Sequence, residues 1–278
     1  MTSLVKFEQD GEPRWAVRRH GAFYSLPVQL HELLAMPLSD ARVLYEGVDQ
    51  EISVSEPRLL APVDEQEIWA SGVTYQRSRE GRTEESDHAD LYTLVYDAER
   101  PELFFKTTPG RVVANRDAVG IRKDSNWDVP EAELALVVNS SAEVFGYLIG
   151  NDMSSRSIEG DNPLYLPQAK FYTRSCALSS EIVPAWEVAE PTFPIATLIE
   201  RDGEKVYEAD TSTATMRRNF PELVDWLFRS LEFPVGVVLL TGTGLVPDRG
   251  FTLHEGDVIT ISIGGLGTLS NPVTVVGR

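Results

Sequence analysis

Cysteine is almost missing from this chain of 278 residues, since Cys176 is the only one. A single thiol excludes an intramolecular disulfide and argues against a metal site built from cysteine. Long apolar runs are missing too: no stretch approaches the roughly 18 residues that a membrane-spanning helix needs. The N-terminus has no basic flank followed by an apolar segment, so no secretory signal is predicted. We therefore expect a cytoplasmic protein.

Positive charge is also scarce. Lys and Arg number 25 against 43 Asp and Glu, which gives a formal net charge of −18. Such a chain repels phosphate groups, so neither nucleic acid nor an anionic membrane is expected as a partner. The hydrophobic content of 42% is ordinary for a globular protein, and the length suffices for one large or two modest domains.

The most informative stretch of the chain runs from Trp127 to Cys176. Two apolar runs, 134–138 and 144–149, are separated by the turn formers at 139–141. Short β-rich runs divided by turn residues are typical of a buried hairpin. We therefore expect two paired antiparallel strands here.

Acidic residues stand at the open end of this hairpin. Glu131 and Glu133 precede the first apolar run, and Asp152 follows the second. Residues i and i+2 of a strand share a face, so both glutamates can point to one spot, with Asp152 beside them. Three carboxylates at such short distances repel one another unless a cation lies among them. Hard oxygen ligands without thiolate favour Mg²⁺.

A plainer interpretation is that these acids are ordinary surface and turn residues. The positive charges nearby favour the metal site. Arg156 follows Asp152 by four residues, and Lys170 lies beyond a segment containing Gly and Pro. Such a segment forms a loop, and loops commonly carry site residues.

The motifs PEAELALVV, GYLIGNDMSSRSIEG, QAKFY and LLTGTG occur in this order. With them, the chain from Ile68 to Val276 resembles the fumarylacetoacetate hydrolase superfamily. The resemblance implies that Glu131, Glu133 and Asp152 hold a divalent cation, usually Mg²⁺, with Mn²⁺ and Ca²⁺ as alternatives. It also implies a homodimer or homotetramer that acts on a small 2-keto acid.

The same resemblance assigns residues around the substrate. Lys170 and Arg156 match the family's lysine and arginine after the metal-binding aspartate, and Lys106 matches its F-x-K position. The turn over 241–244 follows an apolar run, and its glycines let the backbone approach a ligand. The residues expected to contact substrate are Arg156, Lys170, Thr241, Gly242, Thr243, Ser78 and Lys106.

One position departs from the hydrolases of the family. After the matching segment 72–75, Ser78 stands where the hydrolases carry a histidine. Without an imidazole, water activation for C–C hydrolysis lacks its usual base, so a hydrolase is disfavoured. His88 is the only nearby histidine, and Glu84 or Glu85 is a candidate acid or base if the segment closes over substrate.

The segment IEGDNPLYLPQAK is similar to the 2-keto-3-deoxy-pentonate dehydratase branch of the family. We therefore expect a hydro-lyase that converts a 2-keto-3-deoxy sugar acid to 2,5-dioxopentanoate through a metal-stabilised enolate. Lys170 is expected to transfer the C3 proton and Arg156 to orient the substrate, with Glu84 as a further catalytic group. The alternatives are an acylpyruvate hydrolase or oxaloacetate decarboxylase on the same metal, and a non-catalytic metal-stabilised scaffold.

Many short strands and few strong helices predict an α+β protein that is mainly β. Residues 1–62 are expected to form a small N-terminal α/β domain, with strands at 4–7 and 15–17 and a helix at 28–35. Residues 63–278 are expected to form the catalytic domain, for which the resemblance implies a mixed β-sandwich roll. Within it, Asp202-Gly203 predicts a hairpin turn, and 220–228 an amphipathic helix that begins near a proline.

Overall fold

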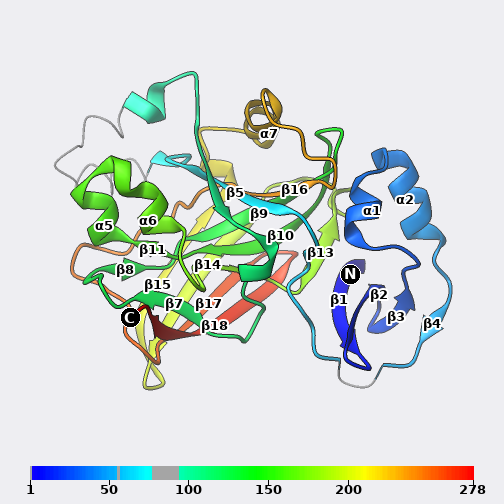
Figure 1. Cartoon of the computed structure of the whole chain (residues 1–278), viewed down its shortest axis with the longest axis horizontal. Helices are drawn as coiled ribbons and strands as arrows, with labels where there is room; N and C mark the ends of the chain where they lie inside the picture. Colours follow the sequence, from blue (N-terminus) through cyan, green and yellow to red (C-terminus); the bar gives the residue numbers. More distant parts are fainter. Residues whose placement is uncertain (1, 55–56, 77–93) are drawn as a thin grey trace.

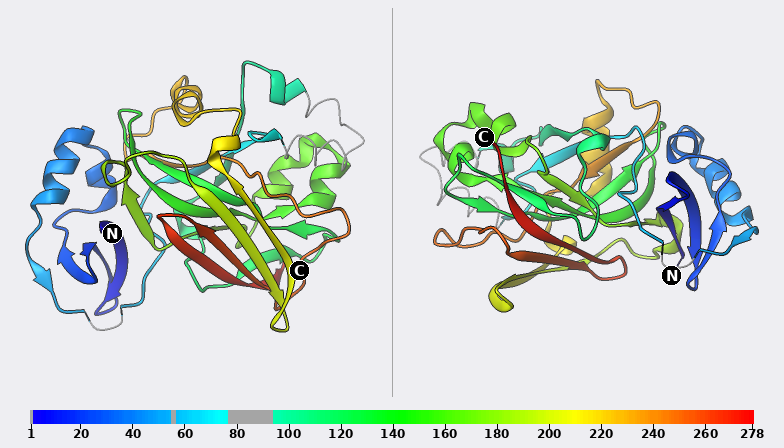
Figure 2. Two further views of the ribbon diagram at one scale, coloured as in Figure 1. Left: turned by 180° about the vertical axis from the view of Figure 1, so that it is seen from behind. Right: turned by 60° about the horizontal axis from the view of Figure 1, so that its bottom comes forward.

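Two twisted β-sheets face each other in the body of the molecule, and short helices lie around them (Figures 1 and 2). This computed structural model describes residues 2–54, 57–76 and 94–278. The prediction of a mainly β sandwich with some helix is confirmed. In the described ranges, no helix is both long and apolar enough to cross a bilayer.

The larger sheet, which has eleven strands among the described residues, runs in the order β4-β3-β2-β1-β13-β10-β9-β16-β5-β6, with β12 also paired to β10. Its strands in the body are β5 (Glu67–Gly72), β6 (Glu102–Thr107), β9 (Ala132–Val138), β10 (Val144–Asp152), β12 (Cys176–Leu178), β13 (Glu181–Pro184) and β16 (Val237–Leu240). Most neighbours are antiparallel, but β16 runs parallel to β5, so the sheet is mixed.

The smaller sheet has the order β15-β14-β17-β18-β7. Its strands are β7 (Val119–Arg122), β14 (Pro194–Arg201), β15 (Glu204–Ser212), β17 (Val258–Ile263) and β18 (Gly267–Val276), and a separate pair is formed by β8 (Asp128–Val129) and β11 (Ser154–Ser155). The turn between β14 and β15 contains Asp202 and Gly203, both at positive φ, so the predicted hairpin is confirmed.

The helices pack against the sheets or stand beside the ends of their strands. Those that lie wholly within the described residues are α1 (Leu30–Leu34), α2 (Leu38–Gly47), α5 (Arg156–Asp161), α6 (Leu166–Lys170) and α7 (Phe220–Phe228), with 3₁₀ turns at Pro109–Arg111, Pro163–Tyr165, Ala185–Glu187 and Thr213–Thr215. The predicted helix at 220–228 is confirmed: the Asn219 side chain accepts a hydrogen bond from the Glu222 backbone N–H, and Pro221 occupies the first turn. Helices α5 and α6 stand beside the open end of β9 and β10 (Figure 1).

The N-terminal residues form the antiparallel strands β1 (Thr2–Gln9), β2 (Glu12–Arg19), β3 (Ala22–Ser25) and β4 (Glu51–Ile52), which α1 and α2 accompany. The strands and the first helix expected in this region are therefore confirmed. Strand β1 also pairs with β13, with Leu4 opposite Ile182, so this unit continues the sheet of the body. The domain boundary after residue 62 stays a prediction.

Strands β9 and β10 form the centre of the larger sheet. Every residue of β9 is buried, and so are all residues of β10 except Val144. Leu134 and Leu136 pack in the core between the two sheets, whereas Ala135 and Val137 pack toward the N-terminal helices. Burial on both faces explains why these strands have continuous apolar runs rather than alternating patterns.

Candidate metal centre and active site

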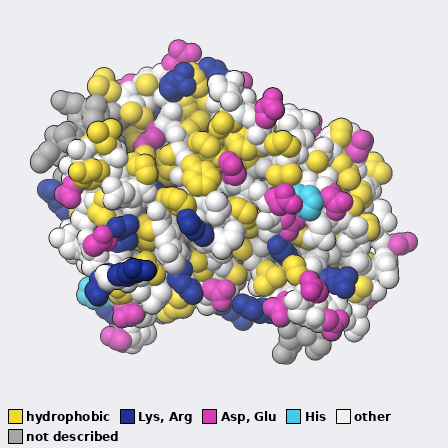
Figure 3. All heavy atoms as spheres, viewed as in Figure 1, with side chains coloured by type: hydrophobic (Ala, Val, Ile, Leu, Met, Phe, Trp, Pro, Cys, Tyr) yellow, Lys and Arg dark blue, Asp and Glu magenta, His cyan; other side chains and the backbone are white. Residues whose placement is uncertain are grey.

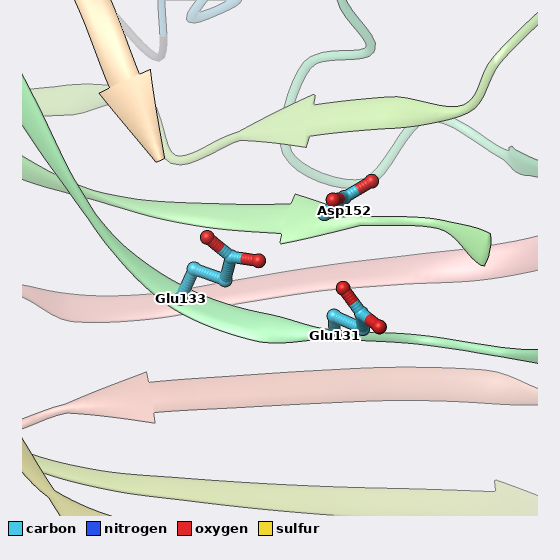
Figure 4. A group of neighbouring side chains, drawn as sticks. All are labelled: Glu131, Glu133 and Asp152. Carbon is cyan, nitrogen blue, oxygen red and sulfur yellow. The ribbon is translucent and has the colours of Figure 1, made fainter. Parts of the chain in front are cut away.

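Three carboxylates meet where the ends of β9 and β10 lie side by side (Figure 4). Glu133 lies on β9 opposite Gly150, and Glu131 immediately precedes that strand. The Asp152 backbone N–H donates to the Glu131 carbonyl oxygen at 3.0 Å, which holds the end of β10 beside the start of β9. One oxygen from each carboxylate lies within 4.8 Å of the others, and all three residues are buried. The expected convergence of these acids is confirmed.

Lys170, the last residue of α6, reaches into this group. Its Nζ donates to Glu131 Oε2 at 2.5 Å, to Ser154 Oγ at 2.6 Å and to Asp152 Oδ2 at 3.0 Å. The residue is only 1% exposed, so these charges interact with little screening by water. Lys170 therefore contacts two of the three carboxylates directly.

Arg156 begins α5 and joins a fourth buried acid to the group. Its Nη2 lies 2.7 Å from Glu131 Oε1, and its Nη1 lies 2.7 Å from Glu159 Oε2. Arg156 and Glu159 are three residues apart, which places them on the same face of α5. Glu131 thus receives Arg156 on one oxygen and Lys170 on the other.

Lys106, near the end of β6, has its ammonium surrounded by acceptors from the protein. Its Nζ lies 2.5 Å from Asp152 Oδ1 and donates to the backbone carbonyl oxygens of Met153, at 3.0 Å, and of Lys170. A lysine has three N–H donors, and three acceptors surround this one. The ammonium thus has two hydrogen bonds and one ion pair to protein groups, and the predicted contact between Lys106 and substrate stays a prediction.

Glu133 shows how well the group suits a cation. The Gly242 N–H donates to Glu133 Oε2 at 2.6 Å, whereas Oε1 has no hydrogen-bond partner among the described residues. Burial, together with the negative charges of Asp152 and Glu131, raises the pKa of Glu133 well above its ordinary value. A buried oxygen without a partner costs about 1–3 kcal/mol. A hard divalent cation would satisfy this oxygen and reduce the repulsion, so the donor set fits Mg²⁺.

Comparison with known proteins identifies the family. Residues 67–274 match the sequence profile of the fumarylacetoacetate (FAA) hydrolase C-terminal domain. The chain belongs to the fumarylacetoacetate hydrolase family. The resemblance that the motifs indicated is therefore confirmed.

Relatives within the fumarylacetoacetate hydrolase family include dehydratases. A probable 2-keto-3-deoxyxylonate dehydratase of Haloferax volcanii is 53% identical over 216 residues, which are 77% of this chain and 74% of the relative. A 2-dehydro-3-deoxy-D-arabinonate dehydratase of Saccharolobus solfataricus is 40% identical over 234 residues, 82% and 78% of the two chains. A solved structure of 2-keto-3-deoxy-D-arabinonate dehydratase complexed with magnesium and 2,5-dioxopentanoate has a TM-score of 0.88 at 31% identity, covering 99% of this chain and 100% of that one.

The turn after β16 lies against the buried carboxylates of this chain. Gly242 contacts Glu133 through its backbone N–H, as described above. The Thr241 hydroxyl donates to the Leu134 carbonyl oxygen at 2.9 Å, and the Thr243 hydroxyl to the Leu245 carbonyl oxygen at 3.3 Å. These contacts fix the turn beside the metal centre, and its binding of substrate stays a prediction.

Ser78, Glu84 and His88 lie outside the described residues, so their predicted roles stay predictions. The structure adds Ser154 and Glu159, which the sequence analysis did not select. Glu159 could have been found from the sequence, because it lies three residues after Arg156 and would share a helix face with it. Ser154 had no such signal, because its contact with Lys170 depends on how α6 packs.

Proposed function

We propose that this protein is a Mg²⁺-dependent hydro-lyase that dehydrates a 2-keto-3-deoxy-pentonate to 2,5-dioxopentanoate. The observation that carries the proposal is the contact of Lys170 Nζ with Glu131 and Asp152 inside a buried carboxylate group. Two relatives, 53% and 40% identical, bear the names of dehydratases of such acids. A structurally similar dehydratase is complexed with magnesium and 2,5-dioxopentanoate.

Glu131, Glu133 and Asp152 are the residues that would hold Mg²⁺. When bound, Mg²⁺ supplies a Lewis acid that stabilises negative charge developing on the oxygens of a 2-keto acid. The protein keeps these ligands in place through the β9–β10 pairing and the Gly242 N–H. Pre-organised ligands need little rearrangement as the charge develops.

Lys170 is the group that we assign to proton transfer at C3, because its Nζ lies against the ligands and against the Ser154 hydroxyl. Removal of the C3 proton by the neutral amine of Lys170 gives an enolate, and the C4 hydroxyl then takes up a proton and departs as water. The resulting double bond migrates and the C5 alcohol becomes an aldehyde, which yields 2,5-dioxopentanoate. Arg156, held by Glu159, orients a carboxylate or hydroxyl of the substrate.

The charges of the site explain how an acidic protein accepts an anion. Side chains of both signs are scattered over the face shown in Figure 3, and the chain as a whole carries a net charge of −18. Among the described residues, the buried carboxylates of the centre outnumber its buried cations by one: Glu131, Glu133, Asp152 and Glu159 against Lys106, Arg156 and Lys170. With the charge of Mg²⁺ added and with Lys170 protonated, the group carries one positive charge, which a monoanionic keto acid cancels.

The proposal is tested by incubating the protein and Mg²⁺ with 2-keto-3-deoxy-pentonates, and following products by mass spectrometry. Loss of one water and formation of 2,5-dioxopentanoate are expected. Accumulation of pyruvate from acylpyruvates or from oxaloacetate, with no dehydration, would instead indicate hydrolysis or decarboxylation. The Lys170→Met variant is expected to lose turnover while it still binds Mg²⁺, and normal turnover would refute its assigned role.

The family resemblance also leads us to propose a homodimer or homotetramer that works in the cytoplasm. Light scattering coupled to size-exclusion chromatography measures the number of chains. A monomeric mass at micromolar concentration would contradict the oligomer, and fractionation of the source cells would test the compartment.

A further inference from the structure

Lys106 reaches the metal centre from an unexpected direction. It belongs to β6, the last strand in the sheet order, whereas Asp152 ends β10, four places away across β9, β16 and β5. The 2.5 Å ion pair between them therefore requires the sheet to curl until its last strand approaches the end of β10. Lys106 is 0% exposed, so this charge contact is made entirely inside the protein.

The two oxygens of Asp152 have different partners. Oδ2 contacts Lys170 Nζ, which also contacts Glu131, so Oδ2 lies on the side of the other carboxylates. Oδ1 contacts Lys106 Nζ. A carboxylate fixed at both oxygens cannot rotate about its last torsion without breaking an ion pair. Lys106 thus sets which oxygen Asp152 presents to the centre.

The same ammonium holds the backbone on either side of the site. It donates to the carbonyl oxygen of Met153, directly after Asp152, and to that of Lys170 at the end of α6. The carbonyl groups at a helix end lack partners within the helix, and a cation there is favourable. Lys106 therefore holds the backbone of Lys170 in place, and it also holds the Asp152 carboxylate that the Lys170 side chain contacts.

We propose that Lys106 is a positioning residue of this site, which orients Asp152 as a metal ligand and holds Lys170 against it. The inference rests on the proposed function, because it treats Asp152 as a ligand of Mg²⁺. Groups that orient metal ligands commonly change metal affinity by about 10- to 100-fold when they are removed. Lys106 contacts neither substrate nor metal in this role, in contrast to the substrate contact expected from the sequence.

The N-terminal unit offers a matched control. Lys6 is also largely buried, lies 2.9 Å from Asp64, donates to the Val63 carbonyl oxygen at 2.6 Å, and has its Nζ 5.8 Å from the centre of the Trp15 ring. Lys106 has the same kinds of neighbour, including the Tyr172 ring at 6.0 Å. Replacing either lysine with methionine removes a buried, ion-paired ammonium, but only one of them faces the metal centre.

The test uses the full chain with Mn²⁺ alone as a paramagnetic probe, because electron paramagnetic resonance reports both the bound fraction and the symmetry around the ion. Wild type and Lys6→Met are expected to bind one Mn²⁺ per chain with equal Kd. Lys106→Met is expected to bind at least tenfold more weakly and to give a changed spectrum of the bound ion. At saturating Mg²⁺, its kcat for dehydration should fall by a larger factor than its KM changes.

Lys106→Gln is made in parallel, because its amide keeps N–H donors if the methionine variant fails to fold. The inference is overturned if a folded Lys106 variant binds Mn²⁺ within twofold of wild type with an unchanged spectrum. It is also overturned if Lys6→Met loses Mn²⁺ affinity to the same extent, because stability alone would then explain the effect. Wild type is measured first, because a wild-type protein that binds no Mn²⁺ would refute the metal centre itself.

Discussion

Thr74 and Thr241 stand 167 residues apart in the chain, and the Thr74 hydroxyl donates to the Thr241 carbonyl oxygen across 2.7 Å. The bond joins the segment after β5 to the turn after β16. That turn supplies the N–H that Gly242 donates to Glu133. Val73, next to Thr74, has φ of 53°, a conformation that strains a β-branched residue and is found mostly where the surroundings enforce it. The metal centre therefore depends on a contact between two distant motifs.

Gly242→Ala should unfold more easily than wild type. Gly242 has φ of 90°, and a Cβ there would lie 2.1 Å from Thr74 Oγ1. We expect a loss of about 2–5 kcal/mol in the free energy of unfolding, measured by urea denaturation. Gly203→Ala is the control, because Gly203 has φ of 81° with nothing within 4 Å, and strain alone should cost about 1 kcal/mol. Equal losses in both variants would show that the contact with Thr74 is unimportant.

Thr74→Val keeps the shape of the side chain and removes the hydroxyl. The Thr241 carbonyl oxygen then loses a buried donor, which should cost about 1–3 kcal/mol of unfolding free energy. Mg²⁺ affinity, measured by calorimetry, should fall as the turn loosens. Thr260→Val serves as the control, since the Thr260 hydroxyl pairs with the Ser270 hydroxyl on the smaller sheet, at 3.1 Å. If both variants bind Mg²⁺ as wild type does, the link from Thr74 to the centre is refuted.

Glu133→Gln should separate metal binding from stability. The pKa of Glu133 is raised by burial and by Asp152 and Glu131, so folding favours its protonated form. The contribution of protonated Glu133 to the free energy of unfolding is present at low pH and is lost as pH rises through the raised pKa. In EDTA at pH 8, the variant should therefore be at least as stable as wild type. Wild type should gain thermal stability on addition of Mg²⁺, and the variant should not. A variant that Mg²⁺ stabilises equally would remove Glu133 from the ligands.

Asp128→Asn should stabilise the protein in a pH-dependent way. Burial raises the pKa of Asp128 from its ordinary 3.8 to about 6. Folding favours the protonated form of Asp128. Its contribution to the free energy of unfolding is therefore complete below pH 3.8 and is lost as pH rises through about 6. The variant mimics the protonated form. Relative to wild type, it should be equally stable near pH 3.5 and more stable by about 1–3 kcal/mol at pH 7.5, by thermal unfolding at each pH.

Asp124→Asn is the control of opposite sign for Asp128→Asn. A hydrogen bond from Arg122 lowers the pKa of Asp124, so its contribution is present at neutral pH and is lost on acidification. This variant should be slightly less stable than wild type at pH 7.5. The same pH dependence in both variants would contradict the assignment of the Asp128 effect to burial.

Local patterns were enough to predict the core of the site. The apolar runs and turn residues of the β9–β10 hairpin lie close together in sequence, so strand pairing and residue alternation place Glu131 and Glu133 beside Asp152. The Asp202-Gly203 hairpin was predictable for a similar reason, since its turn requires positive φ at both residues. These features depend on chemistry within a few residues of each position.

Contacts between distant segments were not predictable in the same way. The sequence indicated that Lys106 lies near the site but not that its ammonium faces Asp152, because this depends on the curl of the whole sheet. Ser154 and Thr74 are ordinary hydroxyl residues whose partners come from α6 and from the turn after β16. Their roles depend on tertiary packing, which cannot be predicted from the residues next to them in the sequence.

The pairing of β1 with β13 bears on how the chain can be cut or recombined. Removing residues 1–62 would strip the hydrogen-bonding partner from Glu181 and Ile182 and leave β13 as a bare edge. Exposed edges of this kind recruit strands from other molecules. We therefore expect the N-terminal segment to protect the rest of the chain from aggregation, and a truncated protein to precipitate rather than persist as a smaller enzyme.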